Sequence, residues 1–226
     1  MTDALSAPRR PSRAFCVLSG LAGIAGVLMI GTSFAINYGP PADAGTDQLQ
    51  AYAQQHLPGV VWGAWLQAVG PWLISLFALA VVHVCGATQR LSGWMTLLGA
   101  GVLMMVSLSE VTIYLSALAQ APADIAQISA DLGHAMQHLY FIIAAPSLFL
   151  PLGLVIATSR ALPRYLGYLA ILLGVAFVAL GITSIYTVVL SPAVTSLAAV
   201  QSLWWLLAGL TLMARSGAIS RSSDRA

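Results

Sequence analysis

Lysine is absent from this chain, and charged residues of every kind are scarce. Only 7% of the 226 residues are Asp, Glu, Lys or Arg, whereas 59% are hydrophobic. Soluble domains carry about 25% charged residues, so this composition excludes a soluble globular protein and predicts a polytopic membrane protein. The absence of lysine also excludes a retinal protein, because the retinal Schiff base needs a lysine amine.

Net charge and cysteine are low as well. The formal net charge is +2, which is too small to indicate nucleic acid as a partner. The two cysteines, Cys16 and Cys85, fall near the expected cytoplasmic ends of their helices. A reducing compartment keeps such thiols free, so we expect no disulfide.

Long apolar runs fill most of the chain. A membrane-spanning helix needs about 20 apolar residues, and six segments are long enough: roughly 14–36, 60–84, 94–118, 136–158, 166–189 and 196–214. We therefore expect an all-α membrane protein, a bundle of six transmembrane helices. Residues 1–13 would form a cytoplasmic N-terminal segment, 14–214 the transmembrane domain and 215–226 a disordered cytoplasmic tail.

The positions of the basic residues predict the orientation of the bundle. All nine are arginines, and none lies in the loops at 37–59 and 119–135, which instead hold aspartates. Arginine accumulates in cytoplasmic loops, so both termini should be cytoplasmic. The alanine-, leucine- and arginine-rich composition fits the cytoplasmic (inner) membrane of a bacterium, crossed several times.

One acidic residue lies inside the expected third span. Glu110 is the only glutamate of the chain, and an ionisable group in hydrocarbon costs a few kcal/mol unless it has a partner or a role. Glu110 lies roughly 9–12 Å below the outer boundary, counting 1.5 Å per residue. Asp131, His134 and His138 follow at spacings of three and four, which is one face of a helix. Consecutive antiparallel spans pack side by side, so we expect a polar site in the outer leaflet.

Three interpretations of this site stay open. His134 and His138 at i and i+4, with Glu110 and Asp131, would suit copper or zinc. Alternatively, Glu110 and Tyr114 would exchange a proton, in a membrane enzyme acting on a lipid-soluble substrate or in a proton-coupled small-molecule carrier. In the third interpretation, Glu110 only fixes the helix pair in a structural membrane subunit. Whether the protein is an enzyme is therefore open.

Haem is not expected. Two histidines on one helix at i and i+4 cannot bind opposite faces of the same haem. The remaining histidines are His56, in a loop, and His83, near the opposite surface.

Polar residues of other spans fall at a depth similar to that of Glu110. They include Gln67, Thr183 and Gln201, and their common depth predicts a cavity open to the outside. Trp204 and Trp205 lie towards one end of the sixth span, which is typical of the aromatic belts at membrane interfaces.

The expected fourth span carries a local resemblance. Residues 134–153 are H-A-M-Q-H-L-Y-F-I-I-A-A-P-S-L-F-L-P-L-G. This segment resembles a motif of the membrane assembly factors of caa-type cytochrome c oxidases, in which H-M-x-Q-H precedes A-P-x-L-L-x-L-G. The resemblance implies that His134 and His138 are copper-related, and an accessory role would imply another membrane protein as partner.

The resemblance covers about 20 of the 226 residues. As a whole, the chain is similar to uncharacterised six-span integral membrane proteins of bacteria with GC-rich genomes. That second similarity implies no functional residues.

Overall fold

Six helices of the protein are suited to crossing a membrane. The computed structural model describes residues 11–37, 39, 45–118, 128, 131–132, 135–136, 138–184 and 192–222. Within these ranges six helical segments are long and apolar enough: Arg13–Ile36, Ala51–Val84, Leu91–Ser116, Tyr140–Ala157, Arg164–Thr183 and Ala193–Ser220. This confirms the predicted all-α bundle and the number of spans. The cytoplasmic placement of both termini stays a prediction.

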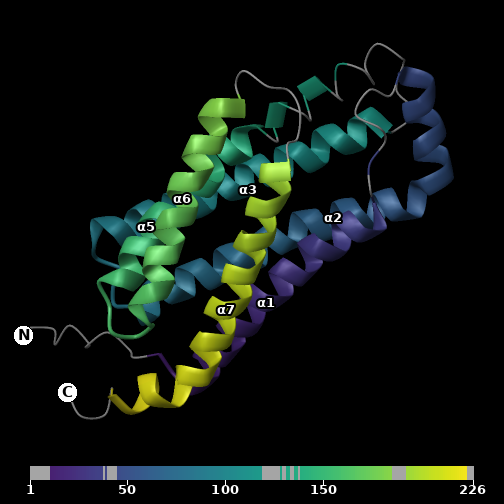
Figure 1. Ribbon diagram of the computed structural model, residues 1–226. Helices are drawn as coiled ribbons and strands as arrows, with labels where there is room; N and C mark the ends of the chain where they lie inside the picture. Colours follow the sequence, from purple (N-terminus) through teal and green to yellow (C-terminus); the bar gives the residue numbers. More distant parts are fainter. Residues whose placement is uncertain are drawn as a thin grey trace, which may run out of the picture.

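From the first to the fifth span each helix packs on the next along the chain, and the sixth lies beside the first. Figure 1 shows the bundle from the side. They are α1 (Arg13–Ile36), α2 (Thr46–Val84), α3 (Leu91–Leu118), η1 (Tyr140–Ala144), α5 (Ala145–Ala157), α6 (Arg164–Ser184) and α7 (Pro192–Ser222). α1 contacts α2, α2 contacts α3, α3 contacts α5, and α5 contacts α6. α7 returns to α1 and closes the ring, whereas its contact with α6 is sparse.

Aromatic side chains fill the middle of the ring. Phe77, Phe149, Phe177 and Trp205 are almost fully buried. Phe149 lies 5.1 Å from Trp205 and 6.1 Å from Phe177, measured between ring centroids. These rings come from α2, α5, α6 and α7, so one aromatic cluster joins four helices.

The expected interfacial position of Trp204 and Trp205 is wrong. Both side chains are core residues, only 2% and 1% exposed. The indole nitrogen Nε1 of Trp204 donates a 2.9 Å hydrogen bond to the carbonyl oxygen of Leu166. A buried indole N–H needs an acceptor, and because α6 supplies one, Trp204 does not need water or lipid headgroups.

Glycines allow two of the helix pairs to approach closely. A Cβ atom on Gly153 of α5 would lie 2.8 Å from the carbonyl oxygen of Gly167 on α6. A Cβ atom on Gly26 of α1 would lie 2.7 Å from the carbonyl oxygen of Gly70 on α2. Neither space admits a side chain, which is typical of helix interfaces built on small residues.

α2 is bent near its start. His56 has φ −117° and ψ 17°, outside the helical region, and Pro58 follows two residues later. Proline lacks an N–H group, and its ring clashes with the carbonyl four residues before it, which kinks a helix. The first part of the predicted loop at 37–59 is therefore followed by the helical start of α2, which turns away from the rest of that helix in Figure 1.

A wider helical turn opens the fourth span. Over η1 (Tyr140–Ala144) the backbone is a π-helix, and the N–H of Ala145 bonds the carbonyl of Tyr140 five residues earlier. Pro146 follows directly and cannot donate to the carbonyl of Ile142. The extra residue in this turn rotates the preceding residues about the helix axis, and π-turns of this kind are frequent at functional sites.

The last helix is longer than expected. The sequence assigns residues from 215 onward to a disordered tail, whereas α7 continues to Ser222. Residues 215–222 contain no proline. Since proline is the residue that disfavours a helix most strongly, the helix can continue through this segment.

Candidate functional site

The candidate site lies between α3, η1 and α7. The hydroxyl of Tyr140 donates a 2.7 Å hydrogen bond to the side-chain oxygen Oε1 of Gln201 on α7. The carboxyl of Glu110 on α3 exerts an electrostatic effect on this hydroxyl. The hydrogen bond thus joins η1 to α7 and Glu110 lies in their neighbourhood, and all three side chains are half-buried.

Glu110 and Gln201 lie at similar distances from the described ends of their helices. Glu110 lies eight residues before Leu118 of α3, and Gln201 lies nine residues after Pro192 of α7. At 1.5 Å per residue these distances are roughly 12–14 Å. The depth of the two residues in the membrane stays a prediction.

Aromatic rings surround the Tyr140 side of the site. The ring of Tyr140 meets the ring of Phe141 at 5.5 Å and that of Phe177 at 5.9 Å, both edge to face. Such pairs stabilise one orientation of the ring. The phenol is therefore held with its hydroxyl towards Gln201, and apolar groups cover its ring.

A second polar cluster lies one helical turn nearer the C-terminal end of α3. Asn37 follows the end of α1, and its Oδ1 atom accepts hydrogen bonds from Tyr52 at 2.8 Å and from Tyr114 at 3.2 Å. The hydroxyl of Tyr52 also accepts a 3.1 Å bond from the backbone N–H of Gly39. These contacts tie the ends of α1 and α3 to the bent start of α2.

The two clusters share the same face of α3. Glu110 and Tyr114 are four residues apart, so they are neighbours on the helix surface. Polar groups therefore extend along α3 from the end of the bundle at Asn37 towards the Tyr140–Gln201 pair. Of the predicted acid–base pair, Glu110 acts electrostatically on Tyr140, while the hydroxyl of Tyr114 bonds Asn37.

The predicted metal-binding set falls partly on described residues. His138 is half-buried, Asp131 is exposed, and His134 lies outside the described residues. Within the part of the chain that the structure describes, no three His, Cys, Asp or Glu side chains are grouped closely enough to hold a metal ion. The described members Glu110, Asp131 and His138 thus do not make a fitting donor set, and the complete set with His134 stays a prediction.

The other two histidines make aromatic contacts. The ring of His56 lies 4.7 Å from that of Tyr52, beside the second polar cluster. The ring of His83 meets Phe15 edge to face at 5.5 Å, near the opposite end of α2.

Three residues of these clusters are not singled out by the sequence: Asn37, Tyr52 and Tyr140. Tyr140 is six residues after His134, and the only signal for its role is its place next to a proline-containing turn. Asn37 and Tyr52 lie in what the sequence predicts to be a loop. Loops give no periodicity from which a contact between helices could be predicted.

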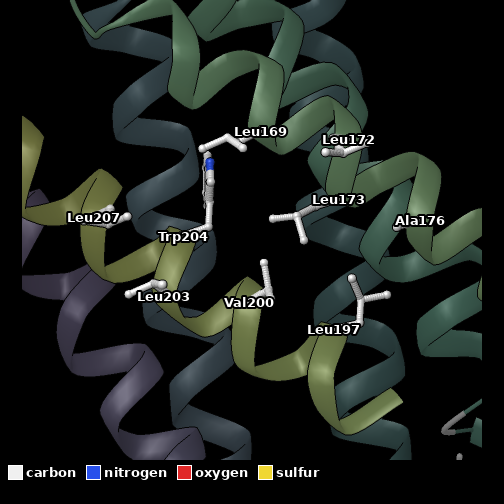
Figure 2. A pocket seen from close by; sticks show the side chains of 9 residues that line it. All are labelled: Leu169, Leu172, Leu173, Ala176, Leu197, Val200, Leu203, Trp204 and Leu207. Carbon is white, nitrogen blue, oxygen red and sulfur yellow. The ribbon is translucent and has the colours of Figure 1, made fainter. Parts of the chain in front are cut away.

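An apolar groove separates α6 from α7 beside this site. Its volume is about 390 Å³, and nine residues of these two helices line it, all of them Leu, Val, Ala or Trp. Figure 2 shows Leu173, Val200 and Trp204 pointing into the space between the two helices. Gln201 follows Leu197 by four residues and precedes Trp204 by three, but it is not among the residues that line the groove.

Comparison of the chain with protein-family models, with curated proteins and with solved structures finds no significant match. The resemblance of residues 134–153 to oxidase assembly factors stays a prediction.

Proposed function

We propose that this polytopic membrane protein binds a lipid-soluble molecule and exchanges a proton at Glu110. The observation that carries the proposal is the hydrogen bond between Tyr140 and Gln201, next to a π-helical turn, with the Glu110 carboxyl acting electrostatically on the same hydroxyl. In this function the protein is either a membrane enzyme or a proton-coupled carrier. The alternative is an accessory protein that binds a metal, which elemental analysis of the purified protein would test.

The chemistry of the three side chains supports an acid–base role. A carboxyl group gains and loses a proton far more readily than a phenol, so Glu110 carries the change of charge. The hydroxyl of Tyr140 can donate and accept, and its bond to Gln201 orients it. Tyr140 and Gln201 are therefore positioning residues, and Glu110 is the residue that exchanges the proton.

The surroundings favour a substrate from the bilayer over one from water. The groove beside the site is wholly apolar, and the rings of Phe141 and Phe177 cover Tyr140. A polar solute would lose its hydration here without replacement. A lipid-soluble molecule with one polar group loses much less hydration, because most of its surface is apolar.

The single glutamate allows a direct test. Glutamate labelled with ¹³C at its side-chain carboxyl gives one protein resonance, because Glu110 is the only glutamate. We expect this resonance to move between protonated and ionised positions as the pH of bilayer-reconstituted protein is varied. The Glu110→Gln variant identifies the signal by its absence, and Tyr140→Phe should change the midpoint.

A carboxyl resonance that does not respond to pH would contradict the proposal. A carboxyl resonance that stays constant over the whole pH range in which the protein remains folded would show a static structural contact. The acid–base function would then be wrong, and the structural interpretation of Glu110 would replace it.

A further inference from the structure

Three exposed arginines lie on two neighbouring turns at one end of the bundle. Arg90 ends the turn between α2 and α3, Arg160 is in the turn between α5 and α6, and Arg164 begins α6. All three side chains are exposed. Both turns lie at the end of the bundle where α1 begins and α7 ends (Figure 1). We call these three residues the arginine surface.

Packing holds the two turns together. The hydroxyl of Ser159 donates a 3.2 Å hydrogen bond to the Sγ atom of Cys85. Buried apolar side chains support this contact: Val82, Ala87 and Val155. Arg160 directly follows Ser159, and the charge of Arg90 acts on the thiol of Cys85. Arginines from both turns therefore flank a single contact between them.

The arginine surface has no negative charge of its own to balance it. Residues 84–94 and 157–168 contain neither Asp nor Glu. The first turns of α3 and α6 have no acidic residue, and the N-terminal end of a helix adds partial positive charge. Because like charges held near one another repel, this surface is complementary to an anion.

The identity of the cations favours phosphate. Every basic residue of the surface is arginine, and the chain has no lysine. A guanidinium group matches two oxygen atoms of a phosphate and binds them through parallel hydrogen bonds. Phosphate of anionic lipids is bound by basic surfaces of this kind between the ends of membrane-spanning helices.

Aromatic side chains follow two of the arginines by one helical turn. Trp94 is four residues after Arg90 and its N–H bonds the carbonyl of Arg90, and Tyr168 is four residues after Arg164. Trp94 is 57% exposed and Tyr168 is 60% exposed. Exposed aromatic rings near the ends of spans lie at the level of lipid headgroups. A soluble acidic protein would reach the arginines but not these rings, so the pattern favours a lipid.

From these observations we infer that the arginine surface binds an anionic phospholipid, with its phosphate on Arg90 and Arg160 and its glycerol backbone towards the rings of Trp94 and Tyr168. The inference goes beyond the proposed function and does not depend on Glu110. It holds for either orientation of the bundle, because phospholipids are present in both leaflets.

Native mass spectrometry of the detergent-solubilised protein tests this assignment. Phosphatidylglycerol, which is anionic, is added in one sample, and phosphatidylcholine with the same acyl chains is added in another. We expect phosphatidylglycerol to stay bound where phosphatidylcholine dissociates, because choline balances the charge of its own phosphate. Inorganic phosphate in excess should not displace the lipid.

Charge-matched double variants make the test specific. Arg90→Gln/Arg160→Gln should weaken binding of phosphatidylglycerol about tenfold, as expected for the loss of hydrogen bonds to a charged group. Arg13→Gln/Arg215→Gln is the control, because it removes the same charge at the same end of the bundle, on α1 and α7. Arg90→Lys/Arg160→Lys keeps the charge without the paired bonds and should bind with intermediate affinity.

Three results would overturn the inference. Equal weakening in the two Gln double variants would mean that net positive charge attracts the lipid without a site. Equal retention of phosphatidylglycerol and phosphatidylcholine would show contact through the acyl chains alone. Displacement by inorganic phosphate would assign the surface to a soluble anion in place of a lipid.

Discussion

A tyrosine hydroxyl inside a bilayer needs a hydrogen-bond partner, and this requirement explains why Tyr140 and Gln201 meet. The two residues are 61 positions apart, and nothing in their local sequences connects them. The sequence predicts the depth of Gln201 and of Glu110, because depth follows from counting residues along a helix. It does not predict Tyr140, because the rotation of a π-helical turn depends on how Pro146 fits among its neighbours.

The metal-binding hypothesis makes a prediction at His134 and His138. If these residues bind copper or zinc, protein purified gently in detergent should contain near-stoichiometric metal, and a His134→Ala/His138→Ala variant should lose it. Elemental analysis by plasma mass spectrometry measures this directly. His83→Ala is the control, because His83 lies near the other end of α2 and contacts Phe15. Metal-free wild-type protein, under conditions that retain metal, would contradict the hypothesis.

Cys85 should be a slow nucleophile. It follows the end of the second span, where burial raises the pKa of its thiol from 9.0 to about 11. The hydroxyl of Ser159, which bonds Sγ at 3.2 Å, and the charge of Arg90 lower this pKa only in part. The thiolate is the reactive form, so at pH 8 about one thiol in a thousand is ionised instead of about one in ten.

Alkylation of a Cys16→Ser variant measures this effect, because Cys85 is then the only thiol. The rate should rise roughly tenfold per pH unit up to about pH 11. Ser159→Ala removes a donor that stabilises the thiolate, so it should slow the reaction at any pH below that. A cysteine placed at exposed Gln89, with both native cysteines replaced, is the control. A Cys85 rate equal to that of the control at pH 8 would contradict the raised pKa.

At the scale of the helix, the packing of α5 on α6 depends on Gly153. A methyl group there would lie 2.8 Å from the carbonyl oxygen of Gly167 and 2.9 Å from the backbone nitrogen of Ile171. Backbone atoms cannot move away as a flexible side chain can, so Gly153→Ala should force α5 and α6 apart. Overpacking of this kind costs about 1–3 kcal/mol.

The control for this prediction is Gly101, which has open space around it. Gly101→Ala should leave the free energy of unfolding unchanged or raise it by up to about 1 kcal/mol, because alanine favours the helix. Unfolding in mixed micelles, followed by circular dichroism, compares the two variants. Equal stability of both would show that α5 and α6 are not in close contact.

The helices themselves could be predicted from the sequence, and their local distortions could not. A run of about 20 apolar residues has few alternatives to a spanning helix in a membrane. The bend at His56 and the wide turn at Tyr140 both involve prolines, but a proline alone does not fix the direction of a bend. The burial of Trp204 could not be predicted either, because the carbonyl that accepts its hydrogen bond belongs to another helix.

At the scale of the whole molecule, the arginines predict how the bundle is oriented. Arg13 and Arg164 begin the first and fifth spans, and Arg90 directly precedes the third, so the three arginines gather at one end of the bundle. Alkaline phosphatase is active only where its disulfides form, outside the cytoplasm. A fusion after residue 226 should be inactive, and an insertion within residues 119–127 should be active.

A cytoplasmic fluorescent protein at the same two positions provides the complementary signal. Activity of the phosphatase at the C-terminus would reverse the orientation and place the Glu110 site in the inner leaflet.

The closure of the ring by α7 on α1 has a consequence for biosynthesis. A Cβ atom on Gly20 of α1 would lie 2.7 Å from the carbonyl oxygen of Gly209 on α7, so the first helix to leave the ribosome is completed by the last. Until translation has delivered α7, α1 carries a glycine-lined face without its partner. A chain that stops before the sixth span would expose that face to chaperones and membrane proteases, and the cell could recognise an unfinished molecule by its first helix.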